Sequence, residues 1–161
     1  MLDIVTYGSE ILGAKAEPVK EINAEIRELA EGMFEAMAGK GIGLAGPQVG
    51  RGLRLFVTDV ERDKKRVFVN PEIVLTSQEQ TEIEEGCLSL PRLYLDVLRP
   101  ESVRVQAWNE KGRPFTVEAG GLLARVILHE YDHLDGVLFI DRLKPGKRDR
   151  ALAQYHKLNK A

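Results

Sequence analysis

Two histidines, His129 and His133, flank Glu130 in the pentapeptide HEYDH. Because residues four apart lie on one face of an α-helix, both imidazoles can reach the same cation. Glu130 is adjacent to His129, where its carboxylate can exchange a proton with water at that cation. The alternative is a pair of core histidines satisfied by protein partners. The pattern favours a metal site, because two buried imidazoles need partners and a cation supplies them.

The third metal ligand is not found downstream of this pentapeptide. A catalytic site of this kind needs three protein ligands and one open position. The residues after His133 are LDG, without the Glu or His that many helical metallopeptidases place there. The single cysteine, Cys87 in EGCLSLP (85–91), is the remaining soft donor. The alternative is an inert buried cysteine, which is the commoner role of a lone Cys.

The segment GIGLAGPQVG (41–50) contains Gly41, Gly43 and Gly46 in the spacing G-x-G-x-x-G. A dinucleotide-binding fold requires a strand before this motif and a helix after it, whereas here a helix precedes and a strand follows. The loop carries one uncharged amide, Gln48, which suits a carbonyl or an oxyanion. The alternative is an ordinary connecting turn.

The hydrophobic period predicts the elements that must position these residues. Helical spacing runs from Ile22 to Met37, returns from about Glu118 to Leu134, and a short last helix is expected over 148–158. Alternating apolar residues between the first two helices predict antiparallel strands at 53–57, 67–69, 72–75, 80–84, 103–107 and 115–117. This order indicates an α+β fold in which antiparallel sheets pack around the helix that carries HEYDH.

Composition indicates one soluble domain over residues 1–161. The chain is 43% hydrophobic and 30% charged, and no stretch approaches the roughly 18 apolar residues of a membrane span. The start, MLDIVTYGSE, does not resemble a secretory signal. One cysteine permits no intrachain disulfide, which fits a reducing compartment. A net charge of −2 argues against a general polyanion binder.

Positive charge is concentrated at the C-terminal end. Residues 141–161 contain seven Lys or Arg and two acids, so this tail carries +5 and the rest of the chain −7. The common explanation is a solvated helix face, and the alternative is an anchor to an acidic surface such as RNA. We expect the inward side of the helix to be formed by Ala151, Tyr155 and Leu158, and the exposed side by Arg148, Arg150 and Lys157.

Three segments, GIGLAGPQVG, EGCLSLP and HEYDHLDG, resemble the motifs of the peptide deformylase family in their order and spacing. The likeness continues through RVILHEYDHLDGVLFIDRL and covers most of residues 39–143. It implies an α+β hydrolase that removes the N-formyl group from formyl-methionyl nascent chains and releases formate. The family is bacterial or organellar, and we expect a bacterial, cytoplasmic protein because no transit peptide is recognised.

The resemblance also implies the metal chemistry. Cys87, His129 and His133 would be the ligands of one ion, typically Fe²⁺, with Zn²⁺ or Ni²⁺ able to substitute. Glu130 would act as general base and general acid. Arg99 matches a recurrent family position behind the ligands.

The remaining implied roles concern the substrate. Gln48 and the backbone N–H of Leu88 would hold the oxyanion. The cleft and the methionine pocket would be formed by Ile42, Gly43, Leu44, Ile83, Gly86, Leu122 and Val126. Gly43 and Gly86 would also pair with the substrate backbone as an added strand.

This chain differs from the usual motifs of the family at two positions, and the resemblance also implies one binding partner. The family usually has Ala where this chain has Gly46, which we expect to loosen the loop that carries Gln48. Arg125 stands where an apolar residue is common, and we expect it to narrow or rim the pocket. The basic tail is expected to dock on the ribosome near emerging nascent chains. We expect no membrane and no direct DNA binding.

Overall fold

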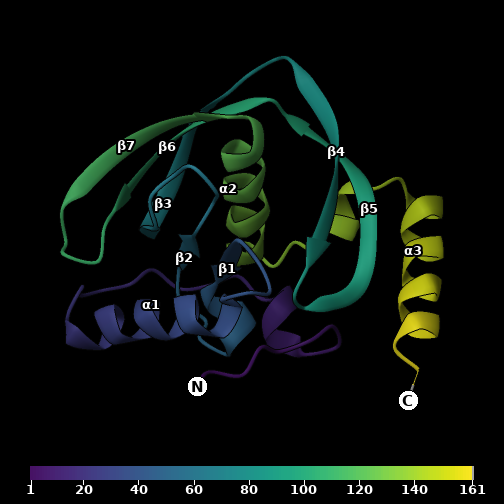
Figure 1. The fold of residues 1–161 in the computed structure, drawn as a ribbon, viewed down its shortest axis with the longest axis horizontal. Coiled ribbons are helices and arrows are strands. Elements are labelled where there is room, and N and C mark those ends of the chain that lie inside the picture. The colour runs from purple at the N-terminus through teal and green to yellow at the C-terminus, as the bar shows by residue number, and fades with distance from the viewer. Residues whose placement is uncertain (161) are drawn as a thin grey trace.

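A computed structural model describes residues 1–160 of the chain (Figure 1). Its longer elements are α1 Ala24–Met37, β1 Gly43–Ala45, β2 Leu55–Thr58, β3 Arg66–Thr76, β4 Gln80–Cys87, β5 Leu90–Pro100, β6 Ser102–Trp108, β7 Pro114–Gly120, α2 Gly121–Leu134 and α3 Pro145–Leu158. Three short 3₁₀ turns are η1 Glu10–Gly13, η2 Gly46–Val49 and η3 Phe139–Arg142. The expected α+β class, with antiparallel sheets and helices at both ends, is confirmed. Within the described residues, no helix has the length and apolar character to cross a membrane.

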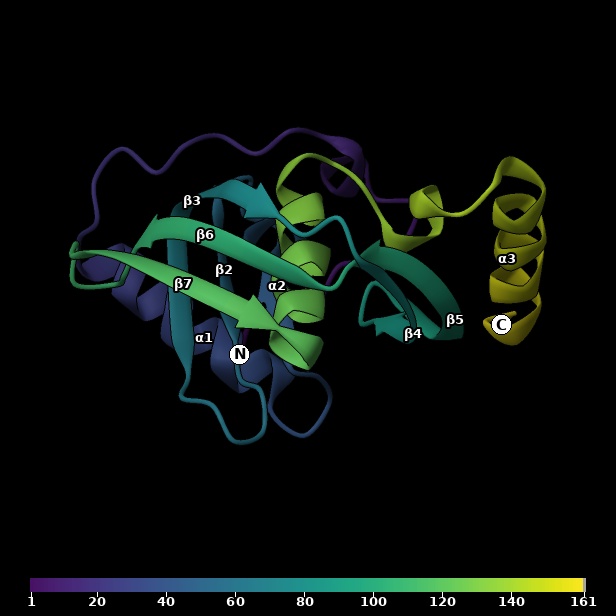
Figure 2. The ribbon, with the colours of Figure 1, turned by 90° about the horizontal axis from the view of Figure 1, so that it is seen from above.

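Two antiparallel sheets flank α2. Five strands pair in the order β1-β2-β3-β6-β7, while β4 and β5 form a separate hairpin. Figures 1 and 2 both show α2 between the large sheet and this hairpin, with α3 on the far side of the hairpin. Apolar residues of the sheet, such as Phe56 and Phe68, form one core cluster with Ala124, Ile127 and Leu128 of α2.

The first helix begins at Ala24, two residues after the start of the apolar spacing, and packs through that spacing. Asn23 is the N-cap, and its side chain accepts a hydrogen bond from the backbone N–H of Ile26 at 3.2 Å. Ile26, Ala30 and Met33 recur at helical spacing and are buried in a second cluster with β1 and β2. This packing fixes the position of the 41–50 loop that follows α1.

The helix α2 begins three residues later than expected. Glu118 still pairs with Arg104 of β6, and Gly120 pairs with Ser102, so β7 leads directly into the helix. The helix stops before Gly136, which has φ +74° and lies so close to η1 that a Cβ would be 2.6 Å from the Gly13 oxygen. Both ends of α2 are therefore set by backbone contacts with neighbouring elements.

Several strand and helix boundaries differ from the sequence prediction. The short strands expected at 67–69 and 72–75 are one strand, β3, with a register shift near Asn70, whose side chain bonds the main chain of Val19. The 41–50 loop contains β1 and η2. The strand β5 has no counterpart in the prediction, because its prolines indicate a break rather than a strand.

The C-terminal helix packs on the outside of the hairpin. It begins at Pro145, three residues before the expected start, because proline is well suited to the first helical position. Ala151 and Tyr155 are buried in a third cluster with residues of β5 and η3. Leu158 is 38% exposed, so the expectation that it faces the domain is wrong: in the last turn its carbonyl contacts the hairpin, where it accepts from Arg92 of β5 at 3.2 Å.

Candidate functional site

The three expected ligands meet where the hairpin approaches α2. Cys87 ends β4, and His129 and His133 lie one turn apart on α2. One donor atom from each lies within 4.8 Å of the others, and the Cys87 sulfur is 3.4 Å from Nε2 of His133. Both histidines are buried. Residues from two separate elements therefore point their donors at one position.

These residues fit a divalent transition-metal ion. A thiolate with two imidazoles is a donor set that suits such ions and leaves one coordination position open. Among the described residues, Oε1 of Glu130 is buried without a hydrogen-bond partner. Leaving a buried polar atom unpaired costs about 1–3 kcal/mol, so this orphaned oxygen indicates that a ligand or water belongs beside it.

Burial perturbs the titratable groups here. Burial raises the pKa of Glu130 to about 7, although the nearby His129 works against this shift. A cation bound at the cluster would lower that pKa again. Burial, with the neighbouring His129, holds the pKa of His133 well below its ordinary value. His133 is therefore neutral, which is the form that binds metal ions.

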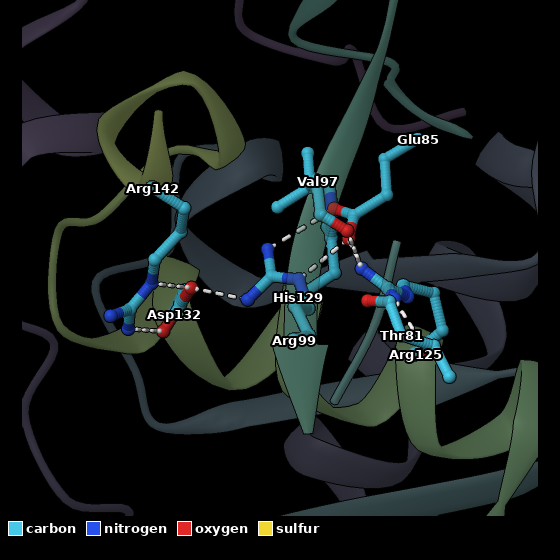
Figure 3. A network of polar contacts seen from close by, with 8 residues as sticks. All are labelled: Thr81, Glu85, Val97, Arg99, Arg125, His129, Asp132 and Arg142. Atoms are coloured by element: carbon cyan, nitrogen blue, oxygen red, sulfur yellow. Dashed lines mark hydrogen bonds and ion pairs between the residues drawn. The ribbon is translucent and has the colours of Figure 1, made fainter. Parts of the chain in front are cut away.

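A carboxylate behind the site orients His129. Nδ1 of His129 donates to Oε1 of Glu85 at 2.8 Å, and Arg99 donates two hydrogen bonds to the same carboxylate, at 2.6 and 3.1 Å (Figure 3). Burial alone would raise the pKa of Glu85, but the bonds from His129 and Arg99 outweigh it and hold that pKa to about 2. Glu85 is thus anionic, and its bond to Nδ1 leaves Nε2 as the ring atom of His129 that can face a metal ion. Burial alone would lower the pKa of His129, but the bonds to Cys87 and Glu85 outweigh it and hold that pKa well above its ordinary value, so a metal ion would replace a proton on binding.

The buried charges continue along α2. Arg99 donates to Oδ2 of Asp132 at 2.8 Å, and Arg142 donates to both oxygens of Asp132. Sequence reasoning placed Arg99 behind the ligands but did not single out Glu85, Asp132 or Arg142. The signal was present for two of them, because Glu85 lies in EGCLSLP and Asp132 lies in HEYDH.

Gln48 is held with its amide nitrogen beside the sulfur. Its side chain is 1% exposed; Oε1 accepts from the N–H of Ala45 at 3.0 Å, and Nε2 donates to Oγ of Ser89 at 3.1 Å. Nε2 also lies 3.5 Å from Sγ of Cys87. Ser89, which sequence reasoning missed, donates in turn to the carbonyl of Val5 at 2.7 Å. The amide orientation is therefore fixed by the protein itself.

A cavity of about 310 Å³ opens beside these groups. Its lining includes these predicted site residues: Ile42, Gly43, Gln48, Gly86, Cys87, Leu88, Leu122, Val126, His129 and Glu130. Leu44 and Ile83 are not part of this lining. The side chain of Leu44 is fully buried in the α1 cluster, on the opposite side of β1 from Gly43. Ile83 lies four residues before Cys87, roughly 13 Å along the strand.

Two glycines allow close approach at the cavity. A Cβ on Gly43 would lie 2.7 Å from both Oε2 of Glu130 and a methyl of Val126. A Cβ on Gly86 would lie 2.5 Å from the ring of Tyr94. Real Cβ atoms do not approach other atoms this closely, so Gly43 is required beside the buried Glu130 and Val126. At Gly86 a Cβ would instead displace the ring of Tyr94, which is 62% exposed.

The structure shows what surrounds Gly46 and Arg125, the two residues that differ from the usual motifs of the family. A Cβ on Gly46 would lie 2.7 Å from the carbonyl oxygen of Leu53 and 2.9 Å from that of Arg51, so the loop is tightly packed rather than loosened. Arg125 borders the cavity as expected, but its side chain is 4% exposed and its guanidinium pairs with Glu85. Its charge therefore points into the protein and not toward the cavity.

An α+β fold that brings a thiolate, two imidazoles and a buried carboxylate to one cavity defines a metal-dependent hydrolase. Residues 1–149 match the sequence model of the polypeptide deformylase family, and the chain belongs to this family. Its members are metallohydrolases that remove the N-formyl group from nascent peptides. This assignment agrees with the resemblance seen in the three sequence motifs.

Individual relatives match over nearly their whole length. The peptide deformylase of Treponema pallidum (strain Nichols) is 50% identical over 155 residues, which cover 96% of this chain and 95% of the relative. The crystal structure of a peptide deformylase from Legionella pneumophila superposes with a TM-score of 0.92 at 40% identity, covering 98% of this chain and 95% of that one. The Ehrlichia chaffeensis peptide deformylase in complex with actinonin gives a TM-score of 0.94 at 36% identity, covering 100% and 99%.

Proposed function

We propose that this chain hydrolyses the formyl amide of formyl-methionyl peptides with Glu130 as the proton-transfer group. The observation that carries the proposal is the buried Glu130 carboxylate, with one oxygen unpaired, next to three donors within 4.8 Å of one another. Residues 1–161 are proposed to act as one catalytic domain, organised around the helix that carries HEYDH.

Cys87, His129 and His133 are proposed to hold the metal ion. Family resemblance favours Fe²⁺, with Zn²⁺ or Ni²⁺ as substitutes. When bound, the ion lowers the pKa of water toward neutrality and polarises the substrate carbonyl. Glu85 holds Nδ1 of His129, which leaves Nε2 free to bind. A thiolate ligand would also make the site sensitive to oxidation at the sulfur.

Glu130 is proposed to move the proton. Its carboxylate takes the proton from the attacking water, whose oxygen bonds to the formyl carbon. The same group then returns the proton to the leaving amine as the carbon–nitrogen bond breaks and formate departs. Burial raises the pKa of Glu130 and a bound cation would lower it, so two opposing effects act on the group that must both accept and donate a proton.

Gln48 and the backbone N–H of Leu88 are proposed to stabilise the oxyanion. One N–H of the Gln48 amide is engaged by Ser89, and the other points toward the sulfur, where an oxygen beside the cluster can receive it. Because the amide is already oriented, little reorganisation is needed as charge develops on the oxygen. Leu88 borders the same cavity.

The cavity is proposed to accept the methionyl side chain and the peptide backbone. Leu122 is 49% exposed and Ile42 is 38% exposed, so apolar surface is left open beside the site, and Val126 continues it. Gly43 and Gly86 border the cavity without side chains, which permits a peptide strand to pair with their backbone. Leu44 and Ile83 are proposed to support this wall from outside the lining.

A hydrolase of internal peptide bonds is the rival function for HExxH. Protein purified under anaerobic conditions is assayed for bound metal, for formate release from a formyl-Met peptide, and for cleavage of an unformylated peptide. We expect Glu130→Gln to retain metal and to release formate about 10²–10⁴-fold more slowly than the wild type. The exposed Glu82 of β4 provides the control, Glu82→Gln, with activity close to wild type. Cleavage of only the unformylated peptide would reject the proposal.

We further propose that α3 docks on the ribosome in the bacterial cytoplasm. Arg150 and Lys157 are exposed on this helix as expected, and so is Lys147, while Ala151 and Tyr155 hold it to the hairpin. Arg148, also expected on the exposed side, is half-buried and pairs with Asp141 of η3 at 2.7 Å. Such a surface suits contacts with RNA phosphates. It would place the cavity near emerging formyl-methionyl chains. No membrane or DNA partner is proposed.

A further inference from the structure

Arg125 is an unusual residue for a helix core. It lies on α2 one turn before His129, and its side chain is 4% exposed. Arginine is almost never this buried unless its charge is paired. Its position on the side of α2 that faces the hairpin places its guanidinium between the two elements that carry the proposed ligands (Figure 3).

The guanidinium contacts both strands of the hairpin. Nη1 donates to Oε2 of Glu85 and to the carbonyl of Val97, each at 2.7 Å. Nη2 donates to the carbonyl of Thr81 at 2.8 Å and to its hydroxyl at 3.2 Å. Glu85 and Thr81 belong to β4, and Val97 belongs to β5. One side chain of α2 thus bonds the main chain or side chain of both strands.

Arg125 also completes the bonding of Glu85. That carboxylate accepts two bonds from Arg99, one from His129 and one from Arg125. A carboxylate has about four acceptor sites, so these four bonds use its capacity and leave it a single orientation. Loss of the Arg125 bond would leave Oε2 held by Arg99 alone and would weaken the restraint on the carboxylate that orients His129.

A second ion pair crosses from the hairpin to α2 at a different level. Arg99 of β5 bonds Asp132, three residues after His129, whereas Arg125 lies four residues before it. With the bond between His129 and Glu85 at the middle, these crossings on either side of His129 restrain the hairpin against turning about the helix. The planar fork of arginine is needed, because a lysine ammonium cannot meet these acceptors in fixed geometry.

We infer that Arg125 is a positioning residue: it fixes β4, with Cys87, against α2, with His129 and His133, and locks Glu85 onto His129. This inference rests on the proposed metal site. It predicts that the loss of the guanidinium weakens metal binding and slows turnover, although Arg125 touches neither the ion nor the substrate carbonyl.

The test uses Arg125→Met, which keeps an unbranched stem at the cavity wall and removes the guanidinium. Co²⁺ affinity is measured by competition with a chelator, together with the Co²⁺ absorption spectrum and steady-state kinetics on a formyl-Met peptide. We expect Co²⁺ binding to weaken about 10–100-fold and its absorption bands to shift. We expect kcat to fall while KM stays within about twofold.

Arg54→Met is the matched control. Arg54 bonds the carbonyl of Leu134 and pairs with Asp135 at the end of α2, without contact to Glu85. We expect this variant to lose stability but to keep the Co²⁺ affinity and spectrum of the wild type.

The Arg125→Met change in a Glu85→Gln background should weaken Co²⁺ binding less than it does in the wild type, because both substitutions break the Arg125–Glu85 link. The remaining loss reports the bonds to Thr81 and Val97.

Two failures are distinguishable. If wild-type protein shows no thiolate-to-cobalt absorption that disappears in Cys87→Ala, the proposed metal site is wrong. If that absorption is present and Arg125→Met keeps wild-type affinity and spectrum, or shifts only KM, the positioning role is wrong. Should Arg125→Met not fold, Arg125→Lys decides: weakened Co²⁺ binding with a shifted spectrum supports the role, and wild-type values overturn it.

Discussion

At the scale of single residues, Gly46 shows how a substitution within a motif is explained by its surroundings. The family commonly has alanine there, and the sequence alone suggested a looser loop in this chain. The structure instead closes the space with the carbonyl oxygens of Leu53 and Arg51, which follow η2 and approach the position of the absent Cβ. The loop that holds Gln48 is therefore adapted to glycine.

Gly46→Ala is expected to lower the free energy of unfolding by about 1–3 kcal/mol, because the added methyl must displace a backbone carbonyl. Urea denaturation followed by circular dichroism measures the change. Gly52→Ala is the matched control, since nothing lies within 4 Å of its Cβ position and its φ is not in the left-handed region. Equal stability of both variants would show that the loop yields easily.

Gln48→Leu is expected to lower kcat about 10²–10³-fold and to change KM much less. The reason is that the proposed hydrogen bond from the Gln48 side chain to the substrate oxygen strengthens as negative charge develops on that oxygen. Steady-state kinetics on a formyl-Met peptide separate the two constants. Gln154→Leu, on the exposed side of α3, provides the control. A loss confined to KM would assign Gln48 to ground-state binding.

The sequence was sufficient for the residues that share a short motif. His129 and His133 lie four residues apart, so their spacing alone predicts that they share one face of the helix, with Glu130 turned about 100° from His129. The bonds around Glu85 join residues 14, 40 and 44 positions apart, and no local pattern indicates them. Long-range ionic pairing requires the register of the hairpin against α2, which only the folded chain provides.

At the scale of elements, the hairpin of β4 and β5 shows why part of the fold was not predictable. Helices and strands with a clean period, such as α1 and β6, were predicted to within a few residues. In β5 the inward positions include Arg99, which is buried only because Glu85 and Asp132 pair with it. Because a charged residue stands at an inward position, the apolar alternation that identifies a strand is interrupted in the sequence.

The helix α3 is expected to act in docking but not in chemistry. Replacing Lys147, Arg150 and Lys157 by Glu should leave hydrolysis of a short formyl-Met peptide nearly intact and weaken co-sedimentation with ribosomes. Binding by the unmodified chain should fall steeply as salt rises, since phosphate contacts release counterions.

A triple Lys→Glu variant at exposed positions distant from α3 provides the charge-matched control: Lys15, Lys20 and Lys111. Equal loss of ribosome binding in both triple variants would mean that net charge, and not α3, governs the association.

At the scale of the whole molecule, buried ion pairs join the large sheet with α2 to the hairpin with α3. Glu85 is central to them, with a pKa of about 2 against an ordinary value of 4.5. Because the pKa of Glu85 is lower in the folded chain than in the unfolded chain, its charge stabilises the fold. This stabilisation is complete at pH values above the unfolded-state pKa and is lost as the pH falls through the folded-state pKa. The difference corresponds to roughly 3 kcal/mol.

We therefore expect the urea midpoint to fall as pH drops from about 5 toward 2, and this loss to be smaller in Glu85→Gln. The Gln variant has no charge to lose at this position, so its stability at neutral pH should already be reduced. Urea titrations at several pH values check both expectations. A parallel pH dependence in the two proteins would place the acid sensitivity elsewhere.

The attachment of α3 has a consequence for how the molecule fluctuates. Its buried contacts are chiefly Ala151 and Tyr155, and they belong to a cluster separate from the one that packs the sheet on α2. We therefore expect the helix to detach and return in a local opening while the sheet and α2 stay folded, which hydrogen exchange would detect as earlier exchange of the α3 amides. If a ribosome displaced α3, this helix would then move as a separate unit, and the donor atoms on α2 would keep their positions.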